Sequence, residues 1–360
     1  MARVFMKGTE AVAEAAVRAG CRFFAGYPIT PQNEVPEYMS RRLPEVGGVF
    51  VQGESEVASI NMVYGAASAG TRSMTSSSSP GIALKSEGIS YCAAARIPMV
   101  YANFARGGPG VGSIQPAQQD YLQATKASGN GGFRMPVLAP GSVQEAVDFT
   151  YKAFDWADRD RTPVLLLADG VIGTMMEPVV LPEMKSDEEV AAIKASKKDW
   201  ACIGHKLDYA HRAWIQPGNW STLVMEQCNK DAEALYRSWA ENDVMVEEYQ
   251  LEDAEVVLTA YGISGRIAKS AVNILRSEGI KAGLIRPLTV YPFPYAAYDH
   301  IDYKKVKGIL DVEMSIPAIF VEDVKVAVKD RCKVETCLRS GGNIMSREAV
   351  LEAARKIVEG

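Results

Sequence analysis

The chain is 360 residues long, with 48% hydrophobic residues, 23% charged residues and a formal net charge of −5. This is the composition of a globular protein of about two domains, and it excludes disordered, collagen-like and low-complexity chains. No apolar run approaches the roughly 18 residues of a membrane span. Glu10 and Glu14 interrupt the N-terminal stretch that a signal peptide would need to be apolar. The mild charge is not gathered in blocks, so we expect a cytoplasmic protein that binds neither nucleic acid nor membrane.

The first half of the chain alternates between helix and strand patterns. An Ala-rich stretch over 9–19, with Gly20 as its stop, predicts a first helix. Ser79-Pro80 predicts the start of another, because Pro is favoured in the first turn after a Ser cap. The other segments, in chain order, are the strands CRFFAG and VGGVFVQ, the helix ESEVASINMVYGAASAG, the strands TRSMTS and IPMVYANFA, the segment MPVLAP, the helix SVQEAVDFTYKAFDWADR and the strand TPVLLLAD. This alternation predicts a parallel sheet with helices on both faces.

The same alternation restarts at AEVVLTAYG (254–262) and runs through a helix, the strands KAGLIRP and KGILDVEM, and a final helix. We therefore expect an α/β fold with two parallel-sheet domains, at 1–175 and 251–360. The segment between them, 176–250, differs because a solvated linker should be poor in aromatic residues. It packs either against its own domains or against a partner, and both alternatives stay open; its tryptophans are Trp200, Trp214, Trp220 and Trp239.

The six cysteines are scattered and form no C-x-x-C motif. An iron–sulfur cluster or a zinc site held by this chain would need closely spaced thiolates or Cys/His pairs. Cys332 and Cys337 are near neighbours, but RCKVETCL alternates like a strand, which favours buried thiols. We expect no metal site in this chain.

Two candidate sites follow early strands. Gly26-Tyr27-Pro28-Ile29-Thr30-Pro31 comes directly after a strand, and its prolines restrict the backbone so that Thr30 is left where parallel sheets place their ligands. A merely rigid turn is an equal alternative. In the helix that follows, Glu56 is in register with the apolar residues Ile60 and Val63, whereas Glu54 is not. Glu56 should thus point inward, where burial suits a carboxyl to sharing a proton with a ligand; the alternative is a simple helix N-terminal charge.

Two further candidates are weaker. The loop Arg106-Gly107-Gly108-Pro109-Gly110-Val111-Gly112-Ser113 is Gly-rich, but it does not fit a dinucleotide fingerprint. Arg106, at a strand end, could bind a carboxylate with its guanidinium. Thr75 and the run Ser76 to Ser79 form a hydroxyl-rich turn that could line a polar pocket, although helix capping would explain at least one of these serines.

The order of these motifs is more specific than any one of them. G-Y-P-I-T-P, Q-G-E-S-E-V-A-S-I-N-M-V-Y-G-A, T-S-S-S-S-P-G-I and R-G-G-P-G-V-G follow one another, and A-Y-G-I-S-G-R, L-I-R-P-L-T-V-Y-P-F-P and D-V-E-M come later. In this order the chain resembles the α subunit of 2-oxoacid:ferredoxin oxidoreductases over nearly its whole length. Q-P-A-Q-Q-D-Y-L-Q-A-T-K is most similar to members that act on the branched-chain substrate 3-methyl-2-oxobutanoate.

The resemblance implies a pyrimidine-type thiamine diphosphate domain followed by a transketolase C-terminal-like domain. Glu56 matches the family glutamate that bonds N1′ of the aminopyrimidine, Thr30 the residue that contacts the substrate near its oxo group, and Arg106 the residue that faces the substrate carboxylate. The resemblance also places further residues at the cofactor: Tyr27, Pro28, Ile29, Ser78 and Ser79.

The resemblance further implies a β subunit that holds Mg²⁺ and the diphosphate half of the site. Ala168-Asp169-Gly170 is similar to the family's G-D-G, but no Asn follows before Asn219. A γ subunit, a ferredoxin-like δ subunit with iron–sulfur clusters, an external ferredoxin and coenzyme A complete the expected reaction. The alternatives are a 2-oxoglutarate-specific member, a non-redox thiamine-dependent half-subunit, and a non-catalytic scaffold. Ile316-Pro317-Ala318-Ile319 departs from the family's Gly-Gln-Met step, which puts subunit contacts or coenzyme A access there in doubt.

Overall fold

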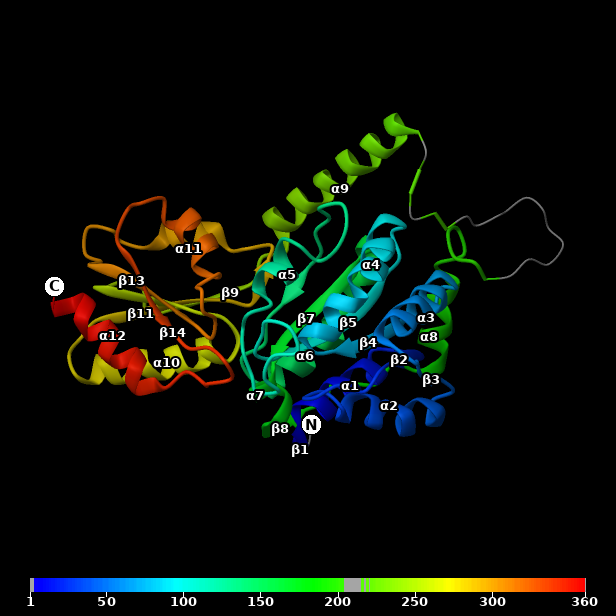
Figure 1. The fold of residues 1–360 in the computed structure, drawn as a ribbon, viewed down its shortest axis with the longest axis horizontal. Helices are drawn as coiled ribbons and strands as arrows, with labels where there is room; N and C mark the ends of the chain where they lie inside the picture. Colours follow the sequence, from blue (N-terminus) through cyan, green and yellow to red (C-terminus); the bar gives the residue numbers. More distant parts are fainter. Residues whose placement is uncertain (1–2, 204–214, 217, 220, 360) are drawn as a thin grey trace.

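The computed structural model describes residues 3–203, 215–216, 218–219 and 221–359. It has two α/β bodies side by side, with the N-terminus on the first and the C-terminus at the far end of the second (Figure 1). The expected α/β class with two parallel sheets is confirmed. Trp214 and Trp220 lie outside the described residues.

The first body is built on a seven-stranded sheet with the strand order β12-β6-β7-β5-β4-β2-β3. Its strands are parallel except for β12, which pairs antiparallel with β6. The strands in chain order are β2 (Phe23–Gly26), β3 (Val49–Gln52), β4 (Ser73–Ser77), β5 (Met99–Ala105), β6 (Val137–Leu138), β7 (Pro163–Asp169) and β12 (Thr289–Tyr291).

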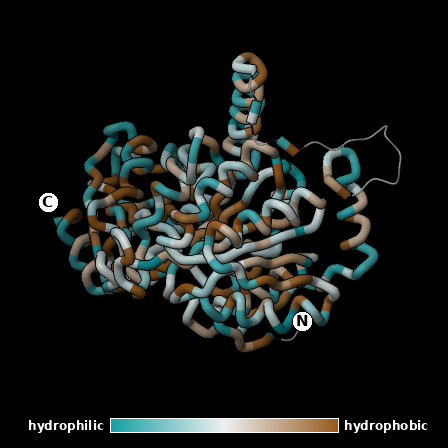
Figure 2. The backbone as a smooth tube through the Cα atoms, turned by 45° about the vertical axis from the view of Figure 1, so that its right-hand side comes forward, coloured by the Kyte–Doolittle hydropathy of each residue, from teal (hydrophilic) through white to brown (hydrophobic). Residues whose placement is uncertain are grey.

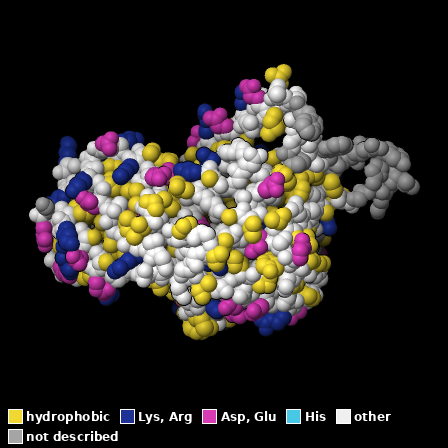
Figure 3. Space-filling view, viewed as in Figure 1, with side chains coloured by type: hydrophobic (Ala, Val, Ile, Leu, Met, Phe, Trp, Pro, Cys, Tyr) yellow, Lys and Arg dark blue, Asp and Glu magenta, His cyan; other side chains and the backbone are white. Residues whose placement is uncertain are grey.

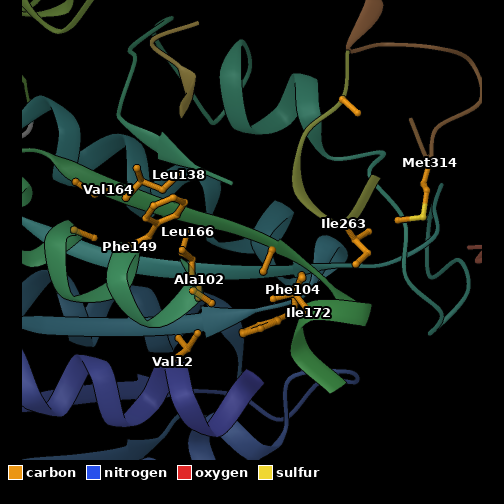
Figure 4. Packing of buried hydrophobic residues seen from close by; sticks show 14 of the residues in the cluster. Val12, Ala102, Phe104, Leu138, Phe149, Val164, Leu166, Ile172, Ile263 and Met314 are labelled. Atoms are coloured by element: carbon orange, nitrogen blue, oxygen red, sulfur yellow. The ribbon is translucent and has the colours of Figure 1, made fainter. Parts of the chain in front are cut away.

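Side chains alternate between the two faces of this sheet, as the pleat of a strand requires. Ala102 and Phe104 of β5 face one helical layer, whereas Tyr101 of the same strand faces the other. The first layer consists of α1 (Gly8–Arg18), α2 (Glu34–Glu45), α6 (Val143–Asp160) and α7 (Gly170–Thr174), and the second of α3 (Glu56–Ser68), α4 (Ser79–Ala94) and the short α5 (Tyr121–Thr125). Figure 4 shows Val12 of α1 and Phe149 of α6 with Leu166 and Ala102 of the sheet in the first layer's core.

The second body has a five-stranded sheet in the order β14-β13-β10-β11-β9, in which only β9 is antiparallel to its neighbour. Its strands are β9 (Val246–Tyr249), β10 (Val256–Thr259), β11 (Ala282–Pro287), β13 (Gly308–Glu313) and β14 (Val334–Leu338). The helices are α10 (Gly262–Ser277) and α12 (Arg347–Glu359) on one face, with α11 (Val321–Val328) and the 3-10 helix η1 (Tyr295–His300) on the other.

One strand crosses between the bodies. β12 lies in the C-terminal half of the chain but forms the edge of the first sheet, with Thr289 opposite Leu138. The hydrophobic core is also shared, because Ile263 and Met314 belong to the same cluster as the first body's Phe104 and Ile172 (Figure 4). The two bodies are therefore joined by pairing and packing as well as by the chain.

The segment between the bodies is structured where it is described. Its elements are β8 (Met176–Val180), which pairs antiparallel with β1 (Arg3–Lys7), α8 (Asp187–Ala195) and α9 (Thr222–Asn242). Helix α9 stands out from the body in Figures 1 and 2 and is buried only at Trp239, near its base. Trp239 donates to Asp160 across 2.8 Å, and Arg161 lies 4.5 Å from the ring centre of Trp200. These two tryptophans thus contact their own chain, which was one of the two alternatives.

The surface differs between the two bodies. In the view of Figure 3, hydrophobic side chains are scattered over the first body, while charged side chains are frequent at the C-terminal end and along α9. Among the described residues, no helix is long and apolar enough to cross a membrane.

Candidate functional site

The carboxyl ends of β2, β4 and β5 meet at one edge of the first sheet, because these strands are parallel neighbours. Tyr27 to Pro31 follow β2, Ser78 follows β4, and Arg106 follows β5. Glu56 is the first residue of α3, which begins after the neighbouring β3. The topology thus brings the separate sequence motifs together at the edge where parallel sheets bind ligands.

Glu56 points inward, as its register predicted. It is buried with 7% of its surface exposed, whereas Glu54 is exposed. Ser55 caps α3 by accepting the backbone N–H of Ala58 across 3.1 Å, which leaves the Glu56 carboxylate free of any capping role. Glu56 also lies in the first turn of α3, so the alternative of a helix N-terminal charge stays open beside its inward position.

The Glu56 side chain lies against α4 at Gly81, where the absence of a side chain leaves room for it. A Cβ atom on Gly81 would stand 2.8 Å from Oε1 of Glu56 and would collide with Oγ of Ser77. Real Cβ contacts are essentially never this close, so a side chain at position 81 would force Oε1 of Glu56 and Oγ of Ser77 to shift, whereas Gly81 leaves room for both. The carboxylate, the end of β4 and the first turn of α4 form one compact polar surface.

The serines divide into two groups. The hydroxyls of Ser77 and Ser78 are buried without a hydrogen-bond partner among the described residues. Ser78 is the N-cap of α4 but its side chain makes no capping bond, and α4 begins at Ser79, so capping does not explain these serines. Ser79 is fully engaged instead: its hydroxyl donates to Asp120 across 2.6 Å and accepts the backbone N–H of Arg106 across 2.9 Å.

Arg106 and Thr30 are held together. The Arg106 guanidinium, 6% exposed, donates from Nη1 to the carbonyl oxygen of Thr30 across 2.8 Å and from Nη2 to that of Val111 across 2.9 Å. Nε of Arg106 has no partner within the described part of the chain. The Thr30 side chain is exposed, as are Tyr27 and Pro28, while Ile29 is half-buried. An accessible wall of Tyr27–Thr30 therefore lies beside a buried cation.

The Gly-rich loop after Arg106 borders the second body. Gly342 of the second body packs closely against this segment. A Cβ atom on Gly342 would collide with Cβ of Gln115, and a Cβ atom on Gly107 would stand 3.3 Å from the backbone N of Gly342. Gln118 continues this contact, because its side chain donates to the carbonyl of Tyr261 across 2.9 Å and accepts the backbone N–H of Met314 across 3.0 Å. The loop thus helps to join the two bodies, a role that its glycines alone did not reveal.

The segment Ile316-Pro317-Ala318-Ile319, which departs from the family's Gly-Gln-Met step, follows the contact between Gln118 and Met314. Gln118 connects Met314, two residues before this departure, to the segment that follows the loop beginning at Arg106. Ile316 itself is exposed. Asp169, which was compared with the family's G-D-G motif, caps α7 by accepting the N–H groups of Val171 and Ile172. Burial raises the pKa of Asp169 to about 6.

Sequence reasoning did not single out Lys85, an ionisable group in this region. Lys85 of α4 is fully buried, and its amine donates to the Thr75 hydroxyl and to the carbonyl of Ser76. A signal was available, because Lys85 lies on the same helical stripe as the buried Ile82, Ile89 and Cys92. A lysine in an apolar stripe is rare enough to indicate a specific partner.

Comparison with known proteins agrees with this geometry. Residues 14–242 match the family described as pyruvate flavodoxin/ferredoxin oxidoreductase, thiamine diphosphate-binding, and residues 254–350 match the pyruvate:ferredoxin oxidoreductase core domain II. The chain belongs to the 2-oxoacid:ferredoxin oxidoreductase family. It is an oxidoreductase subunit with a thiamine diphosphate-binding region, and the expected resemblance is confirmed.

Individual relatives are similar over almost their whole length. The chain is 44% identical to the ketoisovalerate oxidoreductase subunit VorB of Methanothermobacter marburgensis, with 99% of this chain and 98% of the relative covered. It is 35% identical to the 2-oxoglutarate synthase subunit KorA of Methanocaldococcus jannaschii, covering 90% and 92%. Both relatives are named as subunits, which implies that each belongs to a multi-subunit complex.

A solved structure shares the fold. The 2-oxoglutarate:ferredoxin oxidoreductase from Magnetococcus marinus, solved with 2-oxoglutarate, coenzyme A and succinyl-CoA bound, matches with a TM-score of 0.85 at 23% identity. The match covers 99% of this chain but only 65% of that chain. At this identity the likeness shows the fold, and the chain spans about two thirds of the solved one.

The residues at the sheet edge fit a bound aminopyrimidine. Such a ring presents nitrogen atoms that donate and accept, and the site offers a buried carboxylate in Glu56 and two unpartnered hydroxyls in Ser77 and Ser78. Buried polar groups are normally satisfied, so these hydroxyls point to a ligand or a partner chain. Among the described residues, no group of three or more His, Cys, Asp or Glu side chains could hold a metal ion.

Proposed function

We propose that this chain supplies the aminopyrimidine half of the thiamine diphosphate site in a coenzyme A-dependent 2-oxoacid:ferredoxin oxidoreductase, with 3-methyl-2-oxobutanoate as preferred substrate. The observation that carries the proposal is the buried Glu56 carboxylate beside the unpartnered hydroxyls of Ser77 and Ser78. The 44% identity to a ketoisovalerate oxidoreductase subunit, against 35% to a 2-oxoglutarate synthase subunit, supports the branched-chain substrate.

Each candidate site residue of this chain has a distinct role in this proposal. Bound thiamine diphosphate supplies the carbon nucleophile for decarboxylation of the 2-oxoacid. Glu56 holds or accepts a proton at the ring nitrogen next to it, for which a buried carboxyl is suited. Ser77, Ser78 and Ser79 shape the polar wall beneath the ring, and Tyr27, Pro28 and Ile29 form the wall opposite the substrate's entry.

The substrate's charged end is assigned to Arg106. Two of its N–H groups are used in fixing the guanidinium to the carbonyl oxygens of Thr30 and Val111, and Nε is left over. A guanidinium held in this way can accept a carboxylate without first losing side-chain entropy. The exposed hydroxyl of Thr30 next to it is placed to donate to the substrate's oxo group.

The remaining chemistry is assigned to partner chains. A β subunit would hold Mg²⁺ and the diphosphate, and γ and ferredoxin-like δ subunits with iron–sulfur clusters would pass electrons to an external ferredoxin. The naming of both relatives as subunits supports this division. The use of Asp169 as a helix cap supports placing the magnesium half elsewhere. The proposal includes the domain boundaries: a pyrimidine-type thiamine diphosphate domain at 1–175, a connecting segment at 176–250 and a transketolase C-terminal-like domain at 251–360.

A substrate panel tests the proposed reaction. The reconstituted complex is given several 2-oxoacids, and coenzyme A-dependent dye reduction is followed. We expect the highest kcat/KM with 3-methyl-2-oxobutanoate. A higher kcat/KM with 2-oxoglutarate would indicate a 2-oxoglutarate-specific enzyme. Thiamine-dependent turnover without dye reduction would indicate a non-redox enzyme. Since one methyl group changes binding by only ~1–3 kcal/mol, the panel must include close analogues.

Cofactor binding tests the divided site. Isothermal calorimetry is performed with thiamine diphosphate on this chain alone and on the complex. We expect weak binding to the chain alone and tight binding to the complex, because half of the contacts come from the partner. Tight, stoichiometric binding to the isolated chain would contradict the proposal.

A further inference from the structure

Lys85 is an ionisable group at the site that the proposed function does not use. It lies on α4 with none of its surface exposed, one helical turn after Gly81. Residues four apart share a helix face, so Lys85 and Gly81 both look toward β4 and α3. A fully buried lysine is costly unless it has a partner, which makes its surroundings informative.

The partners of Lys85 lie on the strand that also borders Glu56. The amine donates to the hydroxyl of Thr75 and, across 3.3 Å, to the carbonyl oxygen of Ser76. Thr75 and Ser77 are two apart on β4, so their side chains lie on the same face of the sheet. Ser77 in turn lies at Gly81 together with Oε1 of Glu56. The Glu56–Lys85 cluster is thus formed by Glu56, Thr75, Ser77, Gly81 and Lys85.

We propose that Lys85 is a positioning residue for Glu56, and that its buried amine supplies the positive charge that acts on the Glu56 carboxylate beside the carboxyl end of β4. The inference rests on the proposed function, because it concerns the carboxylate that would meet the aminopyrimidine. Lys85 does not touch the substrate in this proposal and acts through Glu56.

Electrostatics agrees with the geometry. Burial lowers the pKa of Lys85 to about 7, and the charge of Glu56 acts in the opposite direction by favouring the ammonium. A methionine of similar length would avoid the cost of burying an amine. Stability alone therefore does not account for a lysine at this position, whereas a role opposite Glu56 does.

The other ionisable groups near this part of α4 are neutral or engaged elsewhere. Burial raises the pKa of Tyr64 on α3, of Cys92 on α4 and of Tyr101 on β5. Further groups stand at the ends of β5 and β7: Asp120, which accepts from Ser79 and Asn103 and interacts with Arg106, and Asp169, which caps α7. Glu56 is the carboxylate that acts on Lys85.

The test uses Lys85→Met, which keeps the side-chain length and removes the charge. The matched control is Lys197→Met, because Lys197 is also buried but is paired with Asp158 across 2.6 Å, apart from the Glu56–Lys85 cluster. Both variants are assembled into the complete complex, and kcat/KM is measured against pH. Because a nearby positive charge favours the ionised form of a carboxyl, its removal should move the acidic limb of the Lys85→Met profile up by about one pH unit. The Lys197→Met limb should not move.

A second measurement does not depend on activity. In the intact chain, stability should rise with pH from about 7 toward 10.5, because there the unfolded chain binds a proton that buried Lys85 has lost. In Glu56→Gln this rise should begin at a lower pH, since the opposite charge is gone. Chemical unfolding at several pH values measures this pH dependence of stability. The measurement does not use Lys85→Met, so it can be made even if that variant does not fold.

The outcomes separate the two proposals. An acidic limb that stays in place in Lys85→Met, or a stability rise that is unchanged in Glu56→Gln, would overturn the role of Lys85. If Glu56→Gln loses turnover in that case, the proposed function stands without it. If Glu56→Gln turns over like the wild type, the proposed function itself fails.

Discussion

Two buried carboxylate clusters, the Glu56–Lys85 cluster in the first body and the Asp311–Glu313 pair in the second, differ in how they are built. In the first body, the Glu56–Lys85 cluster pairs unlike charges and leaves the hydroxyls of Ser77 and Ser78 unpartnered within the described chain. In the second body, Asp311 and Glu313 lie two apart on β13, and both are fully buried.

In the second body the protein itself supplies partners to Glu313 but not to the carboxyl oxygens of Asp311, which have none among the described residues. We call this pair the closed cluster and the Glu56–Lys85 cluster the open cluster. Glu313 accepts the backbone N–H groups of Ile319, Phe320 and Val321 at the start of α11, at 3.0 to 3.3 Å. Burial and the charge of Glu313 raise the pKa of Asp311 well above its ordinary value, and burial also raises that of Glu313. The pair therefore shares a proton and holds a helix. Burial, a shifted pKa and unpartnered atoms occur in both clusters, so they do not by themselves mark a ligand site. The clusters differ in charge: an amine acts on the carboxylate in the first body, and a second carboxyl does so in the second.

The strongest way to break this comparison is Glu56→Gln. We expect it to reduce decarboxylation in the reconstituted complex on the order of a hundredfold or more, because a positioned proton-transfer group is lost. The unfolding temperature should change little, since the amide has the same shape. Turnover near that of the wild type would show that the open cluster is not the reactive one.

Glu313→Gln should affect stability instead. The amide keeps one acceptor for the N–H groups at the start of α11 but loses the charge, so we expect a loss of about 2 kcal/mol in the free energy of unfolding. Denaturant titration measures it. Turnover per folded molecule should stay unchanged, and a selective loss of turnover would give the closed cluster a role in the reaction.

Gly81→Ala sharpens the geometry of the open cluster. The added methyl group would meet Oε1 of Glu56 at 2.8 Å and displace the carboxylate, so we expect turnover to fall about tenfold while the helix gains intrinsic propensity. The matched control is Gly65→Ala on α3, where a Cβ meets nothing within 4 Å. Gly65→Ala should leave turnover unchanged; an equal loss in both variants would contradict the close approach.

The smallest effect is expected from Asp311→Asn. A carboxyl whose pKa is raised in the folded state stabilises the protein below its ordinary pKa of 3.8 and loses this contribution as pH rises. We therefore expect Asp311→Asn to be nearly neutral in acid and to stabilise by on the order of 1 kcal/mol at pH 7. Thermal unfolding at several pH values tests this; an unchanged pH dependence would mean that Asp311 is ionised.

The sequence alone predicted part of the fold and part of the candidate site. The apolar register of α3 correctly predicted that Glu56 is buried and Glu54 exposed. The buried strands β5 and β7 were also visible as apolar runs. Helix α2 was missed because Pro36 and Pro44 lie within it, and both read as helix breakers.

Other features depend on contacts that no local pattern records. Lys85 was overlooked because lysine is normally exposed, and its partner Glu56 lies 29 positions earlier in another helix. The unpartnered state of Ser77 and Ser78 is a property of the packed structure, as is the contact of Gln118 with Met314. The role of each candidate residue in the reaction stays a prediction.

The strand β12 has a consequence for how this gene could be divided. A break near residue 250 would leave the first sheet without its last strand, and the edge of β6 would be exposed to any strand that could pair with it. Two separately made halves would then recognise each other through Thr289–Tyr291, as a donated strand completes an open sheet. Fission at that point would create a two-chain protein with a built-in means of reassembly.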